Sequence, residues 1–547
     1  MILVVDFGSQ TAHLIARRIK ELGVEVKIVH PEALRQVFDS EAQTRGAQGK
    51  RFRDIEGLIL SGGPSSVYAK NAPTIDSQVF QLGIPILGIC YGLQLMAKLV
   101  GGKVVPGKKE YGPAQLKFKV QSSKFKVVEG LPQEFTVWMS HGDEVVELPE
   151  GFEILGSTES VKHAFVGDES KKIYGVQFHP EVEHTENGLQ ILENFINICH
   201  SKLDSESHSR KSQIPNHKFQ INYKSSNSKF QKIEIEEIIT NIKKQVGDSY
   251  VIGAVSGGVD STVAATLTAK AIGDRFIPVY VENGLMREGT EEHVKKIFRK
   301  IGVKPIVVNT VGETLNRLKG ISDPEEKRKI IGKFYIEIFE KEMQKILKAG
   351  KDVSYLLQGT IYSDVIESKG TKHADKIKSH HNVGGLPKNM KLKLLEPMRN
   401  FYKDEVRMIG KMLGLPDEFI HKQVFPGPGY AIRIRGEVTK ERLEKEKQAD
   451  KILLEELEKA DLMKNIFMSF PVLTGAQSVA VKGDGRFFGE VVALRVVQSK
   501  DVMTSNWMQI PYEILQKISS RIINEVPGIS RVVYDITTKP PATMEWE

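Results

Sequence analysis

The sequence is poor in cysteine and has no long apolar run, and both shortages limit what the protein can be. Only Cys90 and Cys199 occur in 547 residues, which excludes a disulfide framework or a four-thiolate zinc site and favours a reducing compartment. No apolar stretch approaches the length of a membrane span, and residues 1–10 lack the basic region and apolar core of a secretory signal. We therefore expect a soluble, cytoplasmic protein without a membrane partner.

Charge of one sign is not in large excess either. The 77 Lys and Arg residues against 69 Asp and Glu give a net charge of +8, a mild excess that suits anionic small substrates as readily as nucleic acid. Because 547 residues exceed what one compact core can serve, we expect about three domains.

Short apolar runs alternate with helical patterns in the first part of the chain. The runs cover residues 2–5, 57–60 and 84–89, and a helical pattern covers residues 11–22. Strands that alternate with helices are typical of a parallel sheet covered on both faces. The pattern therefore predicts an α/β domain over residues 1–200.

Two polar stretches interrupt this pattern. Residues 38–54 contain few large aliphatics, and we expect a surface excursion without chemistry there. Residues 201–232 are rich in Ser, Lys, Asn, Gln and His, a composition that cannot offset the entropy of ordering. We predict a linker over residues 201–232.

Beyond the linker the pattern changes twice. A helical stretch from Ile233, a strand, a glycine-rich turn and an alanine-rich helix near Ser261 predict a second parallel α/β unit over residues 233–424. After PheProGlyProGly, a charged helical stretch and alternating strands predict a smaller domain over residues 425–547. The predicted fold class is α/β, with two parallel-sheet α/β domains followed by a smaller α+β domain.

Cys90 has the surroundings of a reactive thiol. It follows the apolar run 84–89, stands between Gly88 and Gly92, and precedes a helical pattern at residues 93–99, which is a nucleophile-elbow arrangement. Aligned peptide dipoles at a helix N-terminus favour the thiolate, and the glycines allow a tight turn. The alternative is a buried structural cysteine, which is the commoner state of a lone cysteine.

A candidate base and its orienting partner follow an apolar run at residues 173–178. Strand periodicity would send His179 and Glu181 to the same side. An imidazole can deprotonate a thiol when a carboxylate holds it in the right orientation. The SerGlyGlyProSer segment at another strand end could supply the Gly63 N–H for an oxyanion, with the Tyr91 N–H as second donor, or could be an ordinary turn.

These motifs are accompanied by AspPheGlySerGln near the start of the chain, and together they resemble the class I glutamine amidotransferase domain over about the first 200 residues. The resemblance implies that Cys90 attacks the glutamine side-chain amide, that His179 shuttles the proton while Glu181 orients it, and that water clears the thioester to leave ammonia. It places the following residues near bound glutamine, in part on a turn that could also be structural: Gln94, Ser140, His141, Gly142 and Asp143. Cys199, on an amphipathic helix, we assign to the core.

SerGlyGlyValAspSer at residues 256–261 lies between a strand and a helix, where several backbone N–H groups converge on one point. The absence of a Walker ending and of a dinucleotide fingerprint argues against γ-phosphoryl transfer and hydride chemistry. A structural turn is the alternative. The segment resembles the loop of the N-type ATP pyrophosphatases, which cleave ATP between the α and β phosphates. The resemblance implies an ATP site formed by Ser256, Gly257, Gly258, Val259, Asp260, Ser261 and Thr262.

Residues 358–387 are dense in charge and glycine. A solvated loop is the general expectation, and His380 with His381 could suggest zinc, but a carboxylate-rich setting without a nearby thiol fits Mg²⁺ better. We predict a lid that closes over the adenylate and excludes the water that would otherwise hydrolyse it. Its functional residues are Asp364 and Glu367, which with Asp260 would be ligands of Mg²⁺, and Lys369 and Lys378, which would neutralise pyrophosphate.

The order of these units, the lid sequence, PheProGlyProGly, LysProProAlaThr and the final GluTrpGlu resemble the family of glutamine-hydrolysing GMP synthases across nearly the full length. The resemblance implies that ATP adenylates the C2 oxygen of xanthosine 5′-monophosphate (XMP), that ammonia displaces AMP, and that the C-terminal domain forms a homodimer without a nucleic-acid partner. It implies an XMP site formed by Arg328, Gln477, Arg531, Lys539 and Glu545. Without the resemblance, Arg328 and Lys539 could equally be solvated charges.

Three other functions are compatible with parts of the sequence. An NAD synthetase-like ligase would share the phosphate loop but not the C-terminal tail. A thiolation-type protein that binds tRNA would need further catalytic cysteines. A non-catalytic regulatory binder would have no need of Cys90, His179 and Glu181 together.

Overall fold

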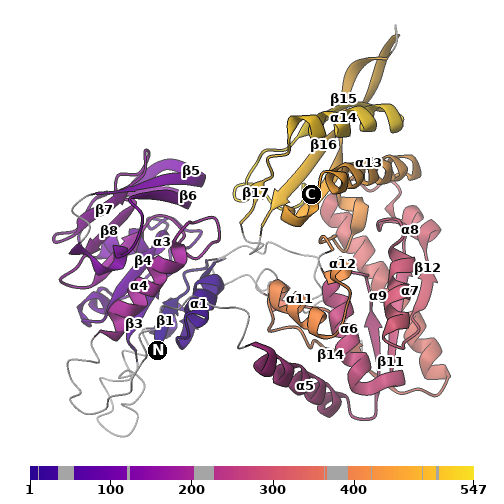
Figure 1. Ribbon diagram of the computed structural model, residues 1–547, viewed down its shortest axis with the longest axis horizontal. Helices are drawn as coiled ribbons and strands as arrows, with labels where there is room; N and C mark the ends of the chain where they lie inside the picture. The colour runs from indigo at the N-terminus through magenta and orange to yellow at the C-terminus, as the bar shows by residue number, and fades with distance from the viewer. Residues whose placement is uncertain are drawn as a thin grey trace.

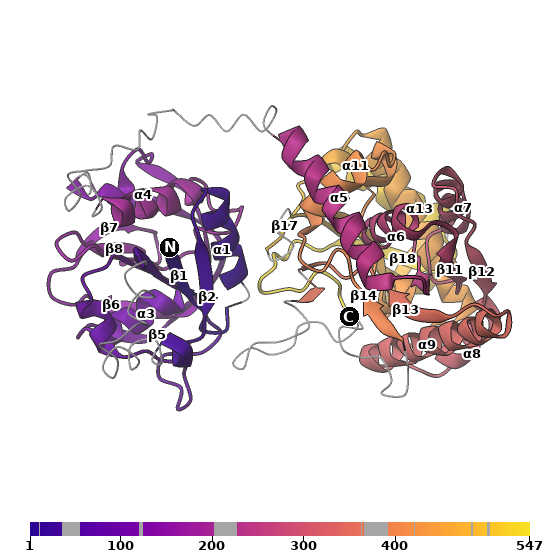
Figure 2. The same ribbon diagram turned by 90° about the horizontal axis from the view of Figure 1, so that it is seen from below.

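The computed structural model describes two lobes that lie side by side (Figure 1, Figure 2). The described residues up to Ser201 form one lobe, and those from Asn227 onward form the other. The described residues are 1–9, 11–34, 55–119, 124–201, 227–362, 364–365, 392–420, 422–482, 485–499 and 504–547. Within these ranges no helix is long and apolar enough to cross a membrane. The expected excursion at residues 38–54 and residues 202–226 of the expected linker lie outside them.

The first lobe is built on a nine-stranded sheet with the order β2-β1-β3-β4-β9-β8-β7-β5-β6. The strands are β1 Ile2–Val5, β2 Val26–Val29, β3 Gly57–Leu60, β4 Ile86–Ile89, β5 Lys103–Phe118, β6 Glu134–Glu147, β7 Glu153–Ser157, β8 Phe165–Asp168 and β9 Ile173–Val176. The expected parallel sheet is confirmed from β2 to β9, and the rest is antiparallel. The sheet is therefore mixed.

In the described part of the first lobe, the helices that cover this sheet include α1 Ala12–Glu21, α3 Tyr91–Leu99 and α4 Gly188–His200. The central strand β4 is buried along its whole length, because helices lie on both faces of the parallel part, and this explains its unbroken apolar sequence. Cys199 on α4 is buried in the same core, and burial raises the pKa of its thiol. The assignment of Cys199 to the core is confirmed.

The second unit has a five-stranded sheet in the order β12-β11-β10-β13-β14, and all its pairs are parallel. The helix expected from Ile233 begins earlier, at Asn227, where polar residues gave no periodic apolar signal. The elements are α5 Asn227–Val246, β10 Tyr250–Ala254, α6 Val259–Ile272, β11 Phe276–Glu282, α7 Thr290–Lys300, β12 Ile306–Asn309, α8 Val311–Leu318, α9 Pro324–Lys348, β13 Val353–Leu357, β14 Lys393–Leu395, α11 Lys403–Met412 and α12 Asp417–Ile420.

The third unit is α+β, as expected. Two of its strands form a long antiparallel hairpin, and the last strand joins the sheet in parallel. The elements are α13 Lys440–Lys459, β15 Met468–Lys482, β16 Gly485–Gln498, β17 Asn506–Trp507, α14 Tyr512–Glu525 and β18 Ile529–Tyr534. Leu285, Leu318 and Ile331 of the second unit pack into the same core as Tyr430 and Leu453. The second and third units therefore share one hydrophobic core.

The two lobes meet where α1 approaches α11. Arg17 on α1 pairs with Asp404 at 2.5 Å and lies over the ring of Tyr402 at 4.4 Å. His13 Nδ1 is 2.6 Å from the Tyr362 hydroxyl. These contacts bring the N-terminal sheet and the second unit together at the ends that carry the predicted chemistry.

Candidate functional site

Cys90 stands in a strained turn between β4 and α3. Its backbone has φ 50° and ψ −106°, a left-handed conformation that is uncommon outside glycine. A Cβ on Gly92 would lie 2.2 Å from the Leu60 carbonyl oxygen, and one on Gly88 would lie 2.8 Å from the Leu93 nitrogen. The elbow therefore requires both glycines, and it places the thiol at the carboxyl edge of the sheet.

His179 and Glu181 lie beside Cys90, but they are not on a strand as expected. β9 ends at Val176, and both residues belong to the loop after it. Because β4 and β9 are adjacent and parallel, their carboxyl ends meet at one edge. His179 Nδ1 is 2.8 Å from Glu181 Oε1, so the orienting contact exists without the strand periodicity that suggested it.

The charge of Glu181 controls the protonation of His179. Burial by itself lowers the pKa of His179, but the charge of Glu181 and the hydrogen bonds with Cys90 and Glu181 together raise it well above 6.5. The backbone is fixed as well, because the His179 N–H donates to the Trp138 carbonyl at 3.0 Å. The imidazole can therefore hold a proton taken from the thiol.

Gly62 makes room for this pair. A Cβ at residue 62 would lie 3.0 Å from His179 Cε1 and 3.8 Å from Cys90 Cβ. The backbone N–H groups of Gly63 and Tyr91 have no hydrogen-bond partner among the residues that the structure describes. Two free donors near the thiol are what an oxyanion requires.

The residues expected near bound glutamine lie on β6 and α3, so the expected turn at residues 140–143 is in fact strand. Pairing of β6 with β5 holds this segment extended. Cys90 Sγ is 3.4 Å from the Ser140 carbonyl oxygen, and Gln94 Nε2 donates to the Asp143 carbonyl at 2.7 Å. Burial lowers the pKa of His141 against the opposing charge of Glu110. The structure thus brings Gln94 and Ser140 to the thiol.

The glycine-rich turn joins β10 to the N-terminus of α6, as expected. Gly257 has φ 76°, and the hydroxyls of Ser256 and Ser261 are 3.0 Å apart. A Cβ on Gly359 would lie 2.8 Å from Ser261 Cα, so the segment after β13 packs directly on the turn. Val259 and Thr262 are buried in α6. The turn therefore offers serine hydroxyls and helix N–H groups to an anion.

Sequence reasoning missed Lys403. Its ammonium lies 2.7 and 2.6 Å from the two carboxylate oxygens of Asp260. Lys403 begins α11 and belongs to no motif that we recognised, and its distance from Asp260 along the chain left no signal of this pairing.

Asp364 is buried, and its Oδ2 accepts a hydrogen bond from the Ile361 N–H at 3.1 Å. The remaining predicted lid residues, Glu367, Lys369 and Lys378, lie outside the described residues, as do His380 and His381. In the part of the chain that the structure describes, no three acidic, histidine or cysteine side chains gather as a metal site. Asp260 and Asp364 have the hard oxygen donors that suit Mg²⁺, although Asp260 is paired with Lys403.

The predicted acceptor residues fall into two groups. The Arg328 guanidinium donates a hydrogen bond to the backbone oxygen of Glu547. The Glu545 carboxylate accepts two hydrogen bonds from Arg433, at 3.2 and 3.1 Å. Lys327, which is fully buried, also pairs with Glu547. The C-terminal tail is thus folded back against α9.

The other group lies on the C-terminal sheet. Arg531 on β18 donates to the Ser478 hydroxyl at 3.1 Å, next to Gln477 on β15. The Lys539 backbone pairs with Ser505. Gln477 and Arg531 thus lie on strands of the C-terminal sheet, whereas Arg328 lies on α9.

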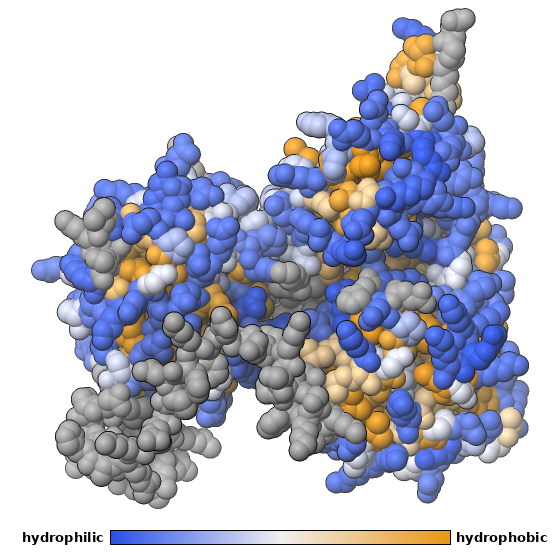
Figure 3. Space-filling view, in the orientation of Figure 1, coloured by the Kyte–Doolittle hydropathy of each residue, from blue (hydrophilic) through white to orange (hydrophobic). Residues whose placement is uncertain are grey.

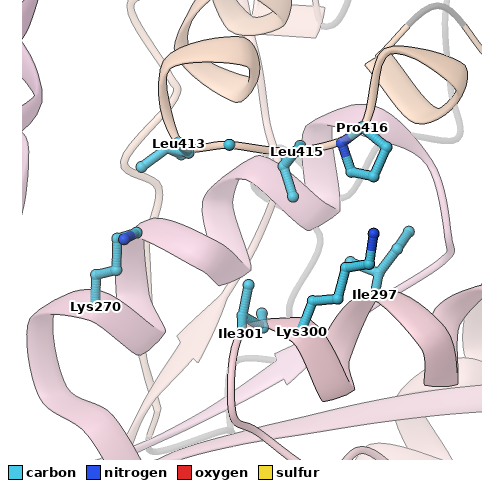
Figure 4. A pocket seen from close by; sticks show the side chains of 8 residues that line it. Lys270, Ile297, Lys300, Ile301, Leu413, Leu415 and Pro416 are labelled. Carbon is cyan, nitrogen blue, oxygen red and sulfur yellow. The ribbon is translucent and has the colours of Figure 1, made fainter.

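A pocket of about 240 Å³ lies at the other end of α6 (Figure 4). Lys270 and Lys300 stand at its rim around an apolar floor that includes Ile297 and Leu415. Both lysines occupy the last turns of their helices, where a cation is stabilised by the helix dipole. Lys270 is separated from Asp260 by roughly 15 Å of helix, so this pocket is distinct from the glycine-rich turn.

Comparisons with known proteins cover the whole chain. The family models described as Glutamine amidotransferase class-I, NAD synthase and GMP synthase C terminal domain match residues 3–199, 232–337 and 455–546. Proteins named GMP synthase (glutamine-hydrolyzing) from Aquifex aeolicus, Thermosipho africanus and Caldanaerobacter subterraneus are 49%, 46% and 44% identical to it. Each alignment covers 100% of this chain and 99% of the relative. The chain therefore belongs to the family of glutamine-hydrolysing GMP synthases.

Proposed function

We propose that this chain makes GMP from XMP, with glutamine as the nitrogen source and ATP as the activating substrate. The contact that carries the glutaminase half is His179 Nδ1 to Glu181 Oε1, at 2.8 Å, beside the strained elbow at Cys90. In this half, Cys90 Sγ attacks the side-chain amide carbon of glutamine, and its proton passes through His179 to the leaving ammonia. Water then cleaves the thioester to give glutamate.

In the second half, we propose that the xanthine C2 oxygen attacks the α-phosphorus of ATP, and pyrophosphate leaves. Ammonia then adds at C2 and AMP leaves, which gives GMP. Ser256, Ser261 and the N–H groups at the start of α6 would bind phosphate oxygens. Asp260 and Asp364 are the described residues that would hold Mg²⁺, which supplies positive charge to the pyrophosphate group when it is bound.

The C-terminal unit favours this acceptor over the alternatives. The match of residues 455–546 to the GMP synthase C terminal domain argues against an NAD synthetase-like ligase. Cys199 is buried in the first lobe, which leaves a thiolation-type protein without its second reactive thiol. We keep the division into residues 1–200, 201–232, 233–424 and 425–547 as part of the proposal.

We also propose that the hairpin of β15 and β16 forms a homodimer contact. It projects from the lobe and carries apolar side chains near its tip (Figure 3). Val481 and Phe488 are 71% and 68% exposed, which is unusual for large apolar side chains without a partner. Phe488→Asp should give a monomer in light scattering, whereas a surface change such as Lys464→Asp should not. A Phe488→Asp protein that remains a dimer would contradict this contact.

The reaction is tested by incubating the protein with MgATP, XMP and either glutamine or an ammonium salt. We expect AMP, pyrophosphate and GMP in both cases. Cys90→Ala should abolish the glutamine-dependent reaction and leave the ammonium-dependent one. Loss of both, or the absence of GMP with the unmodified protein, would overturn the two-site proposal.

A further inference from the structure

Gln177 lies two residues before His179, and the proposed glutaminase reaction gives it no function. Its side chain is fully buried, and Gln177 Nε2 is 3.7 Å from Cys90 Sγ. The backbone of this residue is fixed too, because its N–H donates to the Ala164 carbonyl at 2.9 Å. A buried amide donor therefore faces the reactive sulfur.

The direction of the Gln177 amide is set by a backbone carbonyl. The Asp143 carbonyl can only accept, so the Gln94 atom at 2.7 Å from it must be the amide nitrogen. The same nitrogen carries a second hydrogen, and it donates to Gln177 Oε1 at 3.3 Å. With its oxygen engaged in this way, Gln177 presents its NH₂ group to Cys90 Sγ.

Ionisation of the Cys90 thiol turns its contact with the Ser140 oxygen from attractive to repulsive. As a thiol, Cys90 donates to the Ser140 carbonyl oxygen at 3.4 Å. After its proton has passed to the ring nitrogen of His179 that does not contact Glu181, the same oxygen repels the thiolate. The charged groups facing the thiolate are then the imidazolium of His179 and, behind it, Glu181. A hydrogen-bond donor on another side of the sulfur, such as the Gln177 amide, offsets the repulsion by the Ser140 oxygen.

We propose that Gln177 stabilises the Cys90 thiolate and holds its sulfur in place, with Gln94 fixing the amide that does so. This inference rests on the proposed role of Cys90 as nucleophile. It gives Gln94 a role that does not require contact with the substrate. A hydrogen bond to a charged group typically changes an equilibrium by about tenfold or more.

The decisive variant is Gln177→Glu, which keeps the shape of the side chain but replaces the donor by an oxygen. We expect alkylation of Cys90 by iodoacetamide at neutral pH to slow by about tenfold or more. The ultraviolet absorbance of the thiolate should emerge at higher pH, and the glutaminase kcat should fall more than KM changes. Mass spectrometry of the Cys90 peptide separates this signal from Cys199.

Two further variants separate this role from packing. Gln177→Met removes the donor without adding charge, and it should slow alkylation less than Gln177→Glu does. Gln190→Glu places the same chemical change on α4, where the Gln190 side chain donates a hydrogen bond to Asn194 at 3.0 Å, and should alkylate like the unmodified protein. Ammonium-dependent GMP synthesis should be unchanged in all three, which shows that the lobes are folded.

Normal alkylation rates and an unshifted thiolate absorbance in both Gln177 variants would overturn the inference and leave Gln177 as a packing residue. If Gln177→Glu also loses the ammonium-dependent reaction, the variant is misfolded and Gln177→Met decides. Cys90→Ala distinguishes a failure of the proposed function from a failure of the Gln177 inference. If Cys90→Ala retains glutaminase activity, the proposed function fails; if it does not and the Gln177 variants behave normally, only this inference fails.

Discussion

Lys403 holds Asp260 by both oxygens of its carboxylate, at 2.7 and 2.6 Å. Asp260 lies in the first turn of α6, directly after the glycine-rich turn, and Lys403 begins α11. The next residue, Asp404, pairs with Arg17 of the glutaminase lobe. The start of α11 thus contacts both the proposed ATP loop and the other lobe.

Lys403→Met should weaken the use of ATP. The change removes a positive charge beside the proposed phosphate loop, and it releases the Asp260 carboxylate, a proposed Mg²⁺ ligand, from the position in which Lys403 holds it. We expect the KM for MgATP to rise by about tenfold, with ammonium as well as with glutamine, when pyrophosphate release is measured. Lys295→Met, which removes the exposed pair with Glu291 on α7, is the matched control and should have little effect. A normal KM in Lys403→Met would show that this ion pair is not part of the ATP site.

Glu181→Gln should lower glutaminase activity by roughly 100-fold or more, which is the usual contribution of an acid–base group. Burial still lowers the pKa of His179 in this variant, while the charge of Glu181, which raises that pKa, is lost. The imidazolium then loses its proton at lower pH, so the alkaline limb of the glutaminase pH profile should move toward acid. Glutamate release across a pH series measures this shift. An alkaline limb at its original position would argue against the assignment of His179.

The same substitution should change stability with a defined sign. The pKa of folded His179 lies above the ordinary value of 6.5, so protonation stabilises the fold below about pH 6.5, and this contribution is lost as pH rises through the raised value. The stability difference between the unmodified protein and Glu181→Gln should therefore be largest at acid pH and should narrow at alkaline pH. Urea unfolding at several pH values measures it.

Gly62→Ala should damage the glutaminase without damaging the fold. The added Cβ would lie 3.0 Å from His179 Cε1, so the base must move by a few tenths of an ångström, and loss of alignment can cost on the order of 100-fold in rate. Ammonium-dependent GMP synthesis should be retained. Gly332→Ala is the control, because a Cβ there meets nothing within 4 Å and alanine favours its helix. Equal glutaminase rates in the two variants would contradict the proposed crowding.

The sequence was sufficient to predict those parts of the site that rest on local chain geometry. Cys90 and the turn at residues 256–261 each join a strand to the helix that follows, so residues adjacent in the sequence determine their surroundings. His179 and Glu181 were found for a partly wrong reason, because their contact is made by a loop beyond β9.

Contacts between distant segments could not be predicted in this way. The pairing of Lys403 with Asp260 depends on how α11 packs against α6, and a single lysine has no pattern that reports it. The antiparallel half of the first sheet was missed because β5 and β6 are long, and their alternation is interrupted by glycines and prolines in β5 and by a glycine in β6. Gln177 was visible only as a residue of the strand end until the structure placed it by the sulfur.

Reversing the charge of Arg17 should uncouple the lobes. Arg17→Asp places like charges opposite each other at the contact with Asp404. This contact joins α1 to α11, whose first residue, Lys403, pairs with Asp260. Arg17 is partly exposed, so the effect on stability should be small, whereas the ratio of glutamine-dependent to ammonium-dependent GMP synthesis should fall by roughly fivefold.

The double variant Arg17→Asp with Asp404→Arg tests whether charge pairing is the cause. It restores opposite charges across the same contact, although the stacking of Arg17 on Tyr402 is not restored. We expect the ratio of the two activities to recover in large part. High salt should lower the ratio in the unmodified protein and raise it in Arg17→Asp, because screening weakens the attraction in the first and the repulsion in the second. If both single and double variants keep the original ratio, the Arg17–Asp404 pair holds the lobes in place without coupling their reactions.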